Sequence, residues 1–185
     1  MKPFAQLGGF ILASVSLCAN AIPIATAGTE GYGVVVAHTG DVLATFQGST
    51  AAYSDDLYLN GIKIFNNKAS PVGSMVNLGS FAAGTELIFQ LVVNNTGNLF
   101  YSGDASRNVD LTAHARVESD WLAAGTTLVS FEDLRFGPYN YNDLSFSFTN
   151  TIGDLDPIQI PEPGSLALVL LGLTAFGTVY RSKRP

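Results

Sequence analysis

The sequence predicts an all-β protein, a jelly-roll-like β-sandwich flanked by an N-terminal signal helix and a C-terminal transmembrane helix. Three observations support this fold class. Apolar and polar residues alternate through the middle of the chain, turns rich in Gly, Asn, Asp and Ser separate these runs, and an uncharged apolar run lies near each end of the 185 residues. Period-two alternation is typical of half-buried strands, and many short strands separated by turns are typical of a sandwich.

The N-terminal segment has the order of a secretory signal peptide. Lys2 supplies a positive charge, and the apolar run of residues 7–19 is shorter than the roughly 20 residues that a bilayer span needs. Signal peptidase requires small residues at positions −3 and −1, and this spacing occurs twice, before cleavage after Ala21 and before cleavage after Ala27. We expect cleavage after Ala27, because Pro23 would end the signal helix just ahead of that site.

The strands of the expected sandwich follow one another along the middle of the chain. Alternation is clearest at residues 87–93, 111–117 and 144–149. Further strands are expected at residues 33–37, 42–46, 56–59, 75–78 and 127–131. No part of this region has the 3.6-residue periodicity of an amphipathic helix, so we expect no helix within the domain.

Composition narrows the functions that this middle region can have. Between residues 28 and 160, five Lys and Arg residues stand against fourteen Asp and Glu residues, a net charge of −9, and such a surface repels nucleic acid. The only cysteine, Cys18, leaves with the signal peptide, so no disulfide is expected. Two histidines and the absence of the Gly-x-Ser-x-Gly and His-Glu-x-x-His motifs indicate that the protein is not an enzyme.

Two polar stretches carry candidate metal ligands. The first lies within residues 131–148 and offers carboxylate and amide oxygens from Glu132, Asp133, Asn140, Asn142 and Asp143. Calcium prefers about six to eight such oxygens, and is the candidate cofactor. The second stretch offers Asp104 and Asp110, but it lacks the Gly and Glu positions of an EF-hand loop. For both, the alternative is a solvated turn that uses Asn and Asp to support its backbone.

These stretches together resemble an uncharacterised extracellular β-domain family with a Phe-Glu-Asp-Leu…Asp-Tyr-Asn-Asp-Leu signature. The matching pieces are Phe-Glu-Asp-Leu at residues 131–134, Tyr-Asn-Asp-Leu at residues 141–144, and Ser-Arg-Asn upstream at residues 106–108. The resemblance implies an exported domain with calcium as its candidate ligand. Pro138 and Asn140 stand where the family tends to have Asp, and the loss of two carboxylates is expected to lower calcium affinity.

The C-terminal tail has three parts. A Pro-Glu-Pro motif precedes an uncharged apolar run at residues 164–180, and a basic tail follows; the residues that define the two ends are Pro161, Glu162 and Pro163, then Arg181, Lys183 and Arg184. As a helix the run would reach about 25 Å, slightly short of the ~30 Å hydrocarbon core, and the basic tail would stay cytoplasmic. The two prolines keep the motif extended outside the bilayer, where a processing enzyme can bind it.

This tail resembles the PEP-CTERM sorting domain, whose members are substrates of exosortase. The resemblance implies signal peptidase and exosortase as processing partners, transient anchoring in the inner membrane of a Gram-negative bacterium, and a final place at the cell surface or in the extracellular matrix. Exopolysaccharide is then the candidate partner, and no nucleic acid is expected.

Four segments follow from these signals: a signal peptide at residues 1–27, a β-sandwich at residues 28–150, a linker at residues 151–160 and the sorting signal at residues 161–185. We expect a structural or adhesive role in exopolysaccharide or biofilm, with calcium as the candidate ion. Two alternatives stay open. One is a calcium-assisted carbohydrate-binding module, and the other is a secreted glycan hydrolase with Glu132 and Asp143 as its acid pair.

Overall fold

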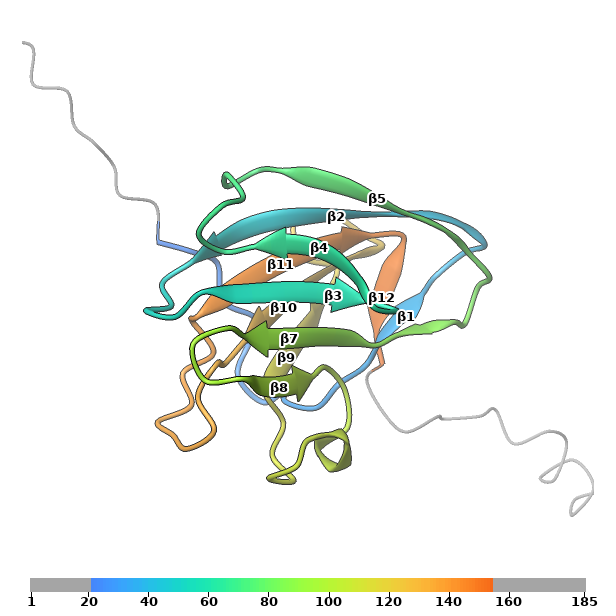
Figure 1. The fold of residues 1–185 in the computed structure, drawn as a ribbon. Helices are drawn as coiled ribbons and strands as arrows, with labels where there is room; N and C mark the ends of the chain where they lie inside the picture. The colour runs from blue at the N-terminus through green and yellow to red at the C-terminus, as the bar shows by residue number, and fades with distance from the viewer. Residues whose placement is uncertain (1–20, 155–185) are drawn as a thin grey trace, which may run out of the picture.

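The computed structural model describes residues 21–154 and confirms an all-β fold (Figure 1). Within these residues there are twelve strands and one short 3-10 turn, with no α-helix. No helix in this described part is long and apolar enough to cross a membrane. The predicted signal helix, the predicted transmembrane helix and all six residues named in the sorting signal lie outside the described residues.

The strands are short and follow one another with brief connections. Their bounds are β1 Val34–Val36, β2 Gly40–Ser49, β3 Asp55–Leu59, β4 Ile62–Asn66, β5 Met75–Phe81, β6 Glu86–Leu87, β7 Phe89–Val93, β8 Asn98–Tyr101, β9 Ala115–Ser119, β10 Thr126–Phe131, β11 Leu144–Thr149 and β12 Thr151–Gly153. The 3-10 turn, η1, spans Ala105–Arg107 between β8 and β9.

These strands form three antiparallel sheets. The two larger sheets have the strand orders β5-β2-β11-β10-β9 and β4-β3-β7-β8, and Figure 1 shows the second sheet lying in front of the first. The third sheet, β12-β1-β6, is built from strands that directly precede or follow members of the two larger sheets. The chain passes between the larger sheets four times, at β2–β3, β4–β5, β5–β7 and β8–β9.

The apolar face of each large sheet packs against the other to form the core. Several pairs of phenylalanines make contact across the two layers. Phe65 of β4 stacks on Phe146 of β11 with ring centroids 5.8 Å apart, and Phe89 of β7 stacks on Phe148 of β11 at 4.2 Å. Burying such a ring contributes roughly 1.5–3 kcal/mol, so the alternation seen in the sequence is what drives the two sheets together.

The structure corrects three sequence predictions in this fold. The strand predicted at residues 111–117 begins only at Ala115, and Leu111 is 72 % exposed with a φ of 57°. Its turn is held by side-chain contacts to the backbone, such as the bond from the Thr112 amide to Asp110 Oδ1 at 3.2 Å, and such contacts compete with strand pairing. Strands β4 and β8 were not predicted, because each carries exposed apolar residues that break a simple alternation.

The third correction concerns the end of the domain. Residues 151–153 form β12 instead of the start of a linker, and they pair with β1 in the register Val34↔Gly153. Thr151 is fully buried and bonds to Thr127 Oγ1 at 2.9 Å. The ordered fold therefore extends past residue 150, whereas residues 155–160 of the predicted linker lie outside the described residues.

Candidate metal centre

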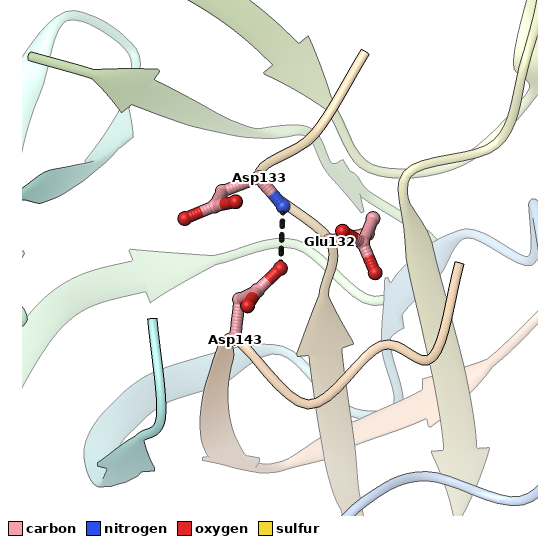
Figure 2. Close-up of side chains that lie close together, drawn as sticks. All are labelled: Glu132, Asp133 and Asp143. Carbon is pink, nitrogen blue, oxygen red and sulfur yellow. Dashed lines mark hydrogen bonds between the residues drawn. The ribbon is translucent and has the colours of Figure 1, made fainter. Parts of the chain in front are cut away.

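The hairpin between β10 and β11 brings three predicted carboxylates together. Phe131 at the end of β10 pairs with Leu144 at the start of β11, so the residues just beyond this pair must meet. Glu132 and Asp133 follow β10, and Asp143 precedes β11; each offers one oxygen, and these oxygens lie within 4.8 Å of one another. Figure 2 shows the three side chains and the bond from the Asp133 amide to Asp143 Oδ2, at 2.9 Å.

The loop of residues 134–142 folds back over this cluster. Glu132 Oε2 accepts hydrogen bonds from the backbone amides of Asn140 at 3.0 Å and Tyr141 at 3.3 Å. Tyr141 is fixed in turn, because its hydroxyl donates to the Ala113 carbonyl oxygen at 2.9 Å. The loop therefore holds one oxygen of Glu132 in place and shields the cluster from solvent.

A fourth carboxylate comes from the opposite sheet. Asp55, the first residue of β3, is fully buried, and its Oδ2 accepts a bond from Asn67 Nδ2 at 3.0 Å. With both carboxylates ionised, Asp55 Oδ1 and Oδ2 of the 3 % exposed Asp133 have no hydrogen-bond partner among residues 21–154; a proton on either carboxyl would let Asp55 and Asp133 bond to each other. Buried carboxylate oxygens without a partner are rare in folded proteins, because their desolvation is costly.

Burial and mutual repulsion change the ionisation of these groups. Burial, together with the nearby charge of Asp143, raises the pKa of Asp55 to about 7, although Lys68 opposes this shift. Burial raises the pKa of Asp133 and of Glu132 as well, and Asp143 adds to both shifts. The raised pKa values of Asp55, Glu132 and Asp133 mean that these groups hold protons near neutral pH, and a cation bound among them would favour their ionised forms.

The donor set fits a hard divalent cation. Two buried oxygens that lack partners come from Asp55 in β3 and from Asp133, which follows β10, and the carboxyl groups of Glu132 and Asp143 lie beside Asp133. Calcium takes oxygen ligands from carboxylates and backbone carbonyls, with water completing its shell. An ion held here would offset the negative charge of the cluster and link the start of β3 to the β10–β11 hairpin.

Of the two amide side chains predicted as ligands, that of Asn140 is engaged elsewhere, and Asn142 makes a contact through its backbone. Asn140 Oδ1 accepts a long bond from the Asn142 amide at 3.4 Å, and the Asn142 carbonyl oxygen accepts from Thr50 Oγ1 at 2.5 Å. These contacts support the loop backbone. Asn140 also serves the cluster through its main-chain amide, as described above for Glu132.

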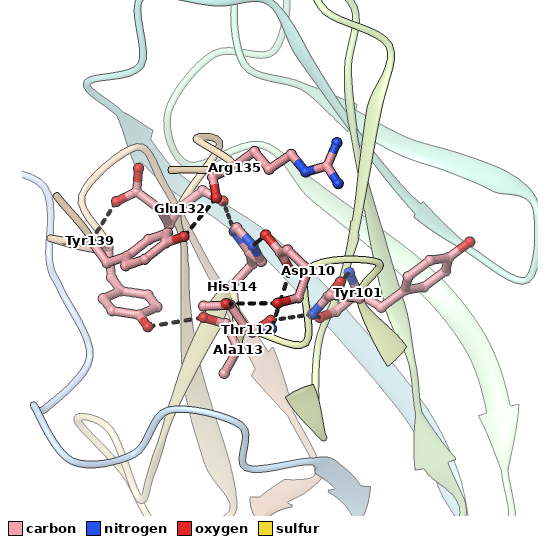
Figure 3. Close-up of polar contacts among 10 residues, drawn as sticks. Tyr101, Asp110, Thr112, Ala113, His114, Glu132, Arg135 and Tyr139 are labelled. Atoms are coloured by element: carbon pink, nitrogen blue, oxygen red, sulfur yellow. Dashed lines mark hydrogen bonds and ion pairs between the residues drawn. The ribbon is translucent and has the colours of Figure 1, made fainter. Parts of the chain in front are cut away.

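The second predicted stretch is not part of this cluster, and each of its two carboxylates accepts a hydrogen bond from another group. Asp104 caps η1 by accepting from the Ser106 amide at 2.8 Å. Asp110 Oδ2 lies 2.9 Å from Nε2 of the fully buried His114, whose Nδ1 lies 3.3 Å from the Glu132 carbonyl oxygen (Figure 3). The His114 ring also stacks on Phe100 with centroids 3.7 Å apart. Of the seven candidate ligands, the structure thus gathers Glu132, Asp133 and Asp143.

Sequence reasoning missed Asp55, although a signal for it was present. Tyr53-Ser54-Asp55 has the same Tyr-x-Asp pattern as Tyr141-Asn142-Asp143, and in both cases a strand begins at or just after the Asp. The alternation of residues 56–59 indicated the strand, but nothing local shows that Asp55 lies beside a hairpin about 80 positions further along the chain.

The C-terminal tail has a counterpart among known proteins. A family model described as the PEP-CTERM protein-sorting motif matches residues 159–184. The match covers Pro161, Glu162, Pro163, Arg181, Lys183 and Arg184, and it implies an extracellular protein that is sorted by exosortase. It does not reach the β-sandwich, so it gives no support to the resemblance noted for residues 106–108, 131–134 and 141–144. No curated protein matches the chain.

Proposed function

We propose that this protein, which the sorting motif marks for exosortase, is a structural or adhesive component of the cell surface or exopolysaccharide matrix of a Gram-negative bacterium. It is exported by its signal peptide and held in the inner membrane until exosortase acts at the Pro-Glu-Pro motif. Its jelly-roll-like sandwich carries a calcium ion at Asp55, Glu132, Asp133 and Asp143. The observation that carries the calcium proposal is the pair of buried carboxylate oxygens without partners, one from each side of the sandwich.

Calcium suits both the site and the compartment. The three carboxyl groups of the cluster, with Asp55 beside them, supply hard oxygen donors, and no sulfur or histidine nitrogen belongs to that cluster. The chain carries one cysteine, and it lies in the signal segment, so the exported domain has no disulfide to stabilise it. A bound ion that links two sheets would take over part of that role.

The burial of the centre supports a structural role over catalysis. Glu132 and Asp133 are 1 % and 3 % exposed, and one Glu132 oxygen is held by two backbone amides. A glycosidase needs its carboxyl groups in an open cleft, with a sugar ring between them. We therefore propose a protein that binds and displays, not one that hydrolyses.

A groove beside the centre supports a second candidate function, calcium-assisted carbohydrate binding. A shallow groove of about 330 Å³ is bordered by Asp133 and by residues with aromatic, amide and cationic side chains, among them Tyr53, Asn98, Arg135 and Phe136. Phe136 is 78 % exposed, and an exposed aromatic face next to polar groups is suited to stacking on a sugar ring. A pull-down with the host's own polysaccharide tests this, and Phe136→Ala is expected to reduce the amount bound.

Calcium binding is tested by thermal unfolding of the exported protein after chelation and after calcium is restored. An ion at about 100 times its Kd stabilises by about 2.7 kcal/mol, which corresponds to a rise in Tm of about 5–10 °C. We expect Asp143→Ala to abolish the rise and Asp104→Asn, in the other polar stretch, to keep it. An unchanged Tm at millimolar calcium would refute the calcium proposal.

Sorting is tested by following the size and location of the protein in a host that has exosortase. Glu162→Gln is expected to leave an unprocessed form in the inner membrane, because the enzyme reads the Pro-Glu-Pro motif. The Asp104→Asn variant is the matched control and should be processed normally. Normal processing of the Glu162 variant would contradict the assigned recognition motif.

A further inference from the structure

The chain before the first strand lies across the outer face of the five-stranded sheet. Residues 22–26 contact four neighbouring strands of that sheet in turn, β2, β11, β10 and β9, and we call this segment the strap. Its contacts were not foreseen from the sequence, which placed these residues within the signal peptide.

Two serines of the sheet are buried beneath the strap. The carbonyl oxygen of Pro23 accepts from Ser145 Oγ at 2.5 Å, and the amide of Ala25 donates to Ser130 Oγ at 2.8 Å. The two serines face each other in the β10–β11 register, and their hydroxyl oxygens are 3.0 Å apart. Both are 0 % exposed although they alternate with core residues, so the strap covers what would otherwise be the solvent face of the sheet.

The two ends of the strap are also fitted to the sheet. Ile22 lies over Gly48 so closely that a Cβ atom at position 48 would meet Ile22 Cγ2 at 2.6 Å. At the other end, the Thr26 amide and hydroxyl both donate to Glu118 Oε2 at 2.8 Å. Ala25 between them is 2 % exposed. The strap therefore contacts one residue in each of four neighbouring strands: Gly48, Ser145, Ser130 and Glu118.

Beyond the strap the chain stays bound to the edge strand β9. The Val117 amide donates to the Thr29 carbonyl oxygen at 3.2 Å, and the Gly31 amide donates to the Ala115 carbonyl oxygen at 3.1 Å. Ala27, the expected cleavage position, therefore lies between two anchored segments. Ala21, the other position, is exposed and lies just outside the strap.

We propose that signal peptidase hydrolyses the Ala21–Ile22 bond, so that the mature protein begins at Ile22 and keeps the strap. Water adds across the peptide bond, which leaves a carboxylate on Ala21 of the released signal peptide and an amino group on Ile22. This inference rests on the proposed export. Cleavage after Ala27 would instead remove every strap contact and expose the hydroxyls of Ser130 and Ser145.

The test is N-terminal sequencing of the exported full chain, with its intact mass as a second measurement. We expect the sequence to begin Ile22-Pro23-Ile24. A start at Gly28 would overturn the strap inference and leave export standing. An N-terminus that still includes the apolar run of residues 7–19 would overturn export and the strap inference together.

Two matched variants identify the position that the peptidase reads. Ala21→Asp places a charged side chain at position −1 of the proposed site and should stop cleavage or move it. Ala27→Asp changes a second exposed alanine and should leave the N-terminus at Ile22. If Ala27→Asp blocked processing and Ala21→Asp did not, the proposed site would be wrong. Slowed hydrogen exchange at the Ala25 amide would report that the retained strap is docked, and rapid exchange there would contradict it.

Discussion

Two polar loops of this domain look alike in sequence and differ in structure. The loop after β8 carries Asp104 and Asp110, and each carboxylate has a protein partner, a backbone amide or the ring of His114. The hairpin loop between β10 and β11 carries Asp133 and Asp143, and there two buried oxygens, one on Asp133 and one on Asp55, have no partner among the described residues. In the first loop the carboxylates already accept hydrogen bonds from the protein. In the second, buried carboxylate oxygens remain that could bind an ion.

This difference shows that the number of acidic residues in a loop does not identify a metal site. A carboxylate that already accepts hydrogen bonds is part of the scaffold, and an ion would have to compete with those bonds. A buried carboxylate without partners gains most from a cation, because nothing else offsets its desolvation. The hydrogen-bond partners of the carboxylates therefore distinguish the two loops, although their amino-acid compositions are similar.

The largest expected loss of stability comes from a substitution at His114, the buried residue that contacts Asp110 in the loop after β8. His114→Ala deletes a buried ring that stacks on Phe100 and contacts Asp110, and it should lower the free energy of unfolding by about 3 kcal/mol. Urea unfolding measures the loss, with the exposed His38→Ala as the control. We expect the calcium-dependent rise in Tm to persist in the variant. Loss of that rise would mean that the two loops act as one site.

The second prediction is that both the stability of the metal-free protein and its calcium affinity depend on pH, because of the carboxyl groups at the hairpin. A carboxyl group with a pKa raised toward 7 stabilises the metal-free fold fully below the ordinary pKa near 4, and that contribution is lost as pH rises through about 7. Metal-free protein should therefore be less stable at pH 8 than at pH 5. Calcium must displace these protons, so its apparent affinity should fall about tenfold per pH unit below 7 for each proton displaced. Calorimetric titration at pH 8 and pH 5.5 measures this, and an affinity independent of pH would contradict the site.

The third prediction uses the ligand that came from the opposite sheet. Asp55→Asn removes one buried negative charge and keeps an oxygen for Asn67. We expect it to raise the Tm of the metal-free protein by about 2–4 °C and to weaken calcium binding about tenfold, or ~1.4 kcal/mol. Asp56→Asn is the matched neighbour, because Asp56 pairs with Lys63 at 2.7 Å, and it should leave calcium affinity unchanged. Equal effects of the two variants would exclude Asp55 from the centre.

The smallest expected effect is at the cap of η1. Asp104→Ala removes the bond to the Ser106 amide on an exposed turn, and it should lower the Tm only slightly. Thermal unfolding with and without calcium measures this, and the calcium-induced shift should stay at its full size. A reduced shift would place Asp104 among the ligands after all.

Much of the fold could be predicted from the sequence because alternation is a local property. The run at residues 87–93 corresponds to β6 and β7, and the run at residues 144–149 corresponds to β11. Their apolar residues lie in the core, as expected. Prediction failed at Leu111, where side-chain contacts to the backbone outweighed an alternating pattern. It also failed at β12, whose three residues are a strand only because β1 lies beside them.

The candidate site was predictable only in part, for the same reason. Glu132, Asp133 and Asp143 are neighbours through one hairpin, so their convergence follows from two adjacent strands. Asp55 joins them because β3 belongs to the sheet that packs over β10 and β11, and no local pattern contains that packing.

The sequence by itself determined the all-β class, the acidic surface and the sorting tail, because periodicity, charge and a contiguous motif can be read along the chain. Only the tertiary structure decided which carboxylates lack partners and where the fold begins at its N-terminal end. The pKa of Asp55 is raised in part by Asp143, 88 positions away, and the Ala25 amide bonds to Ser130, 105 positions away; such distances in sequence close only in the tertiary structure.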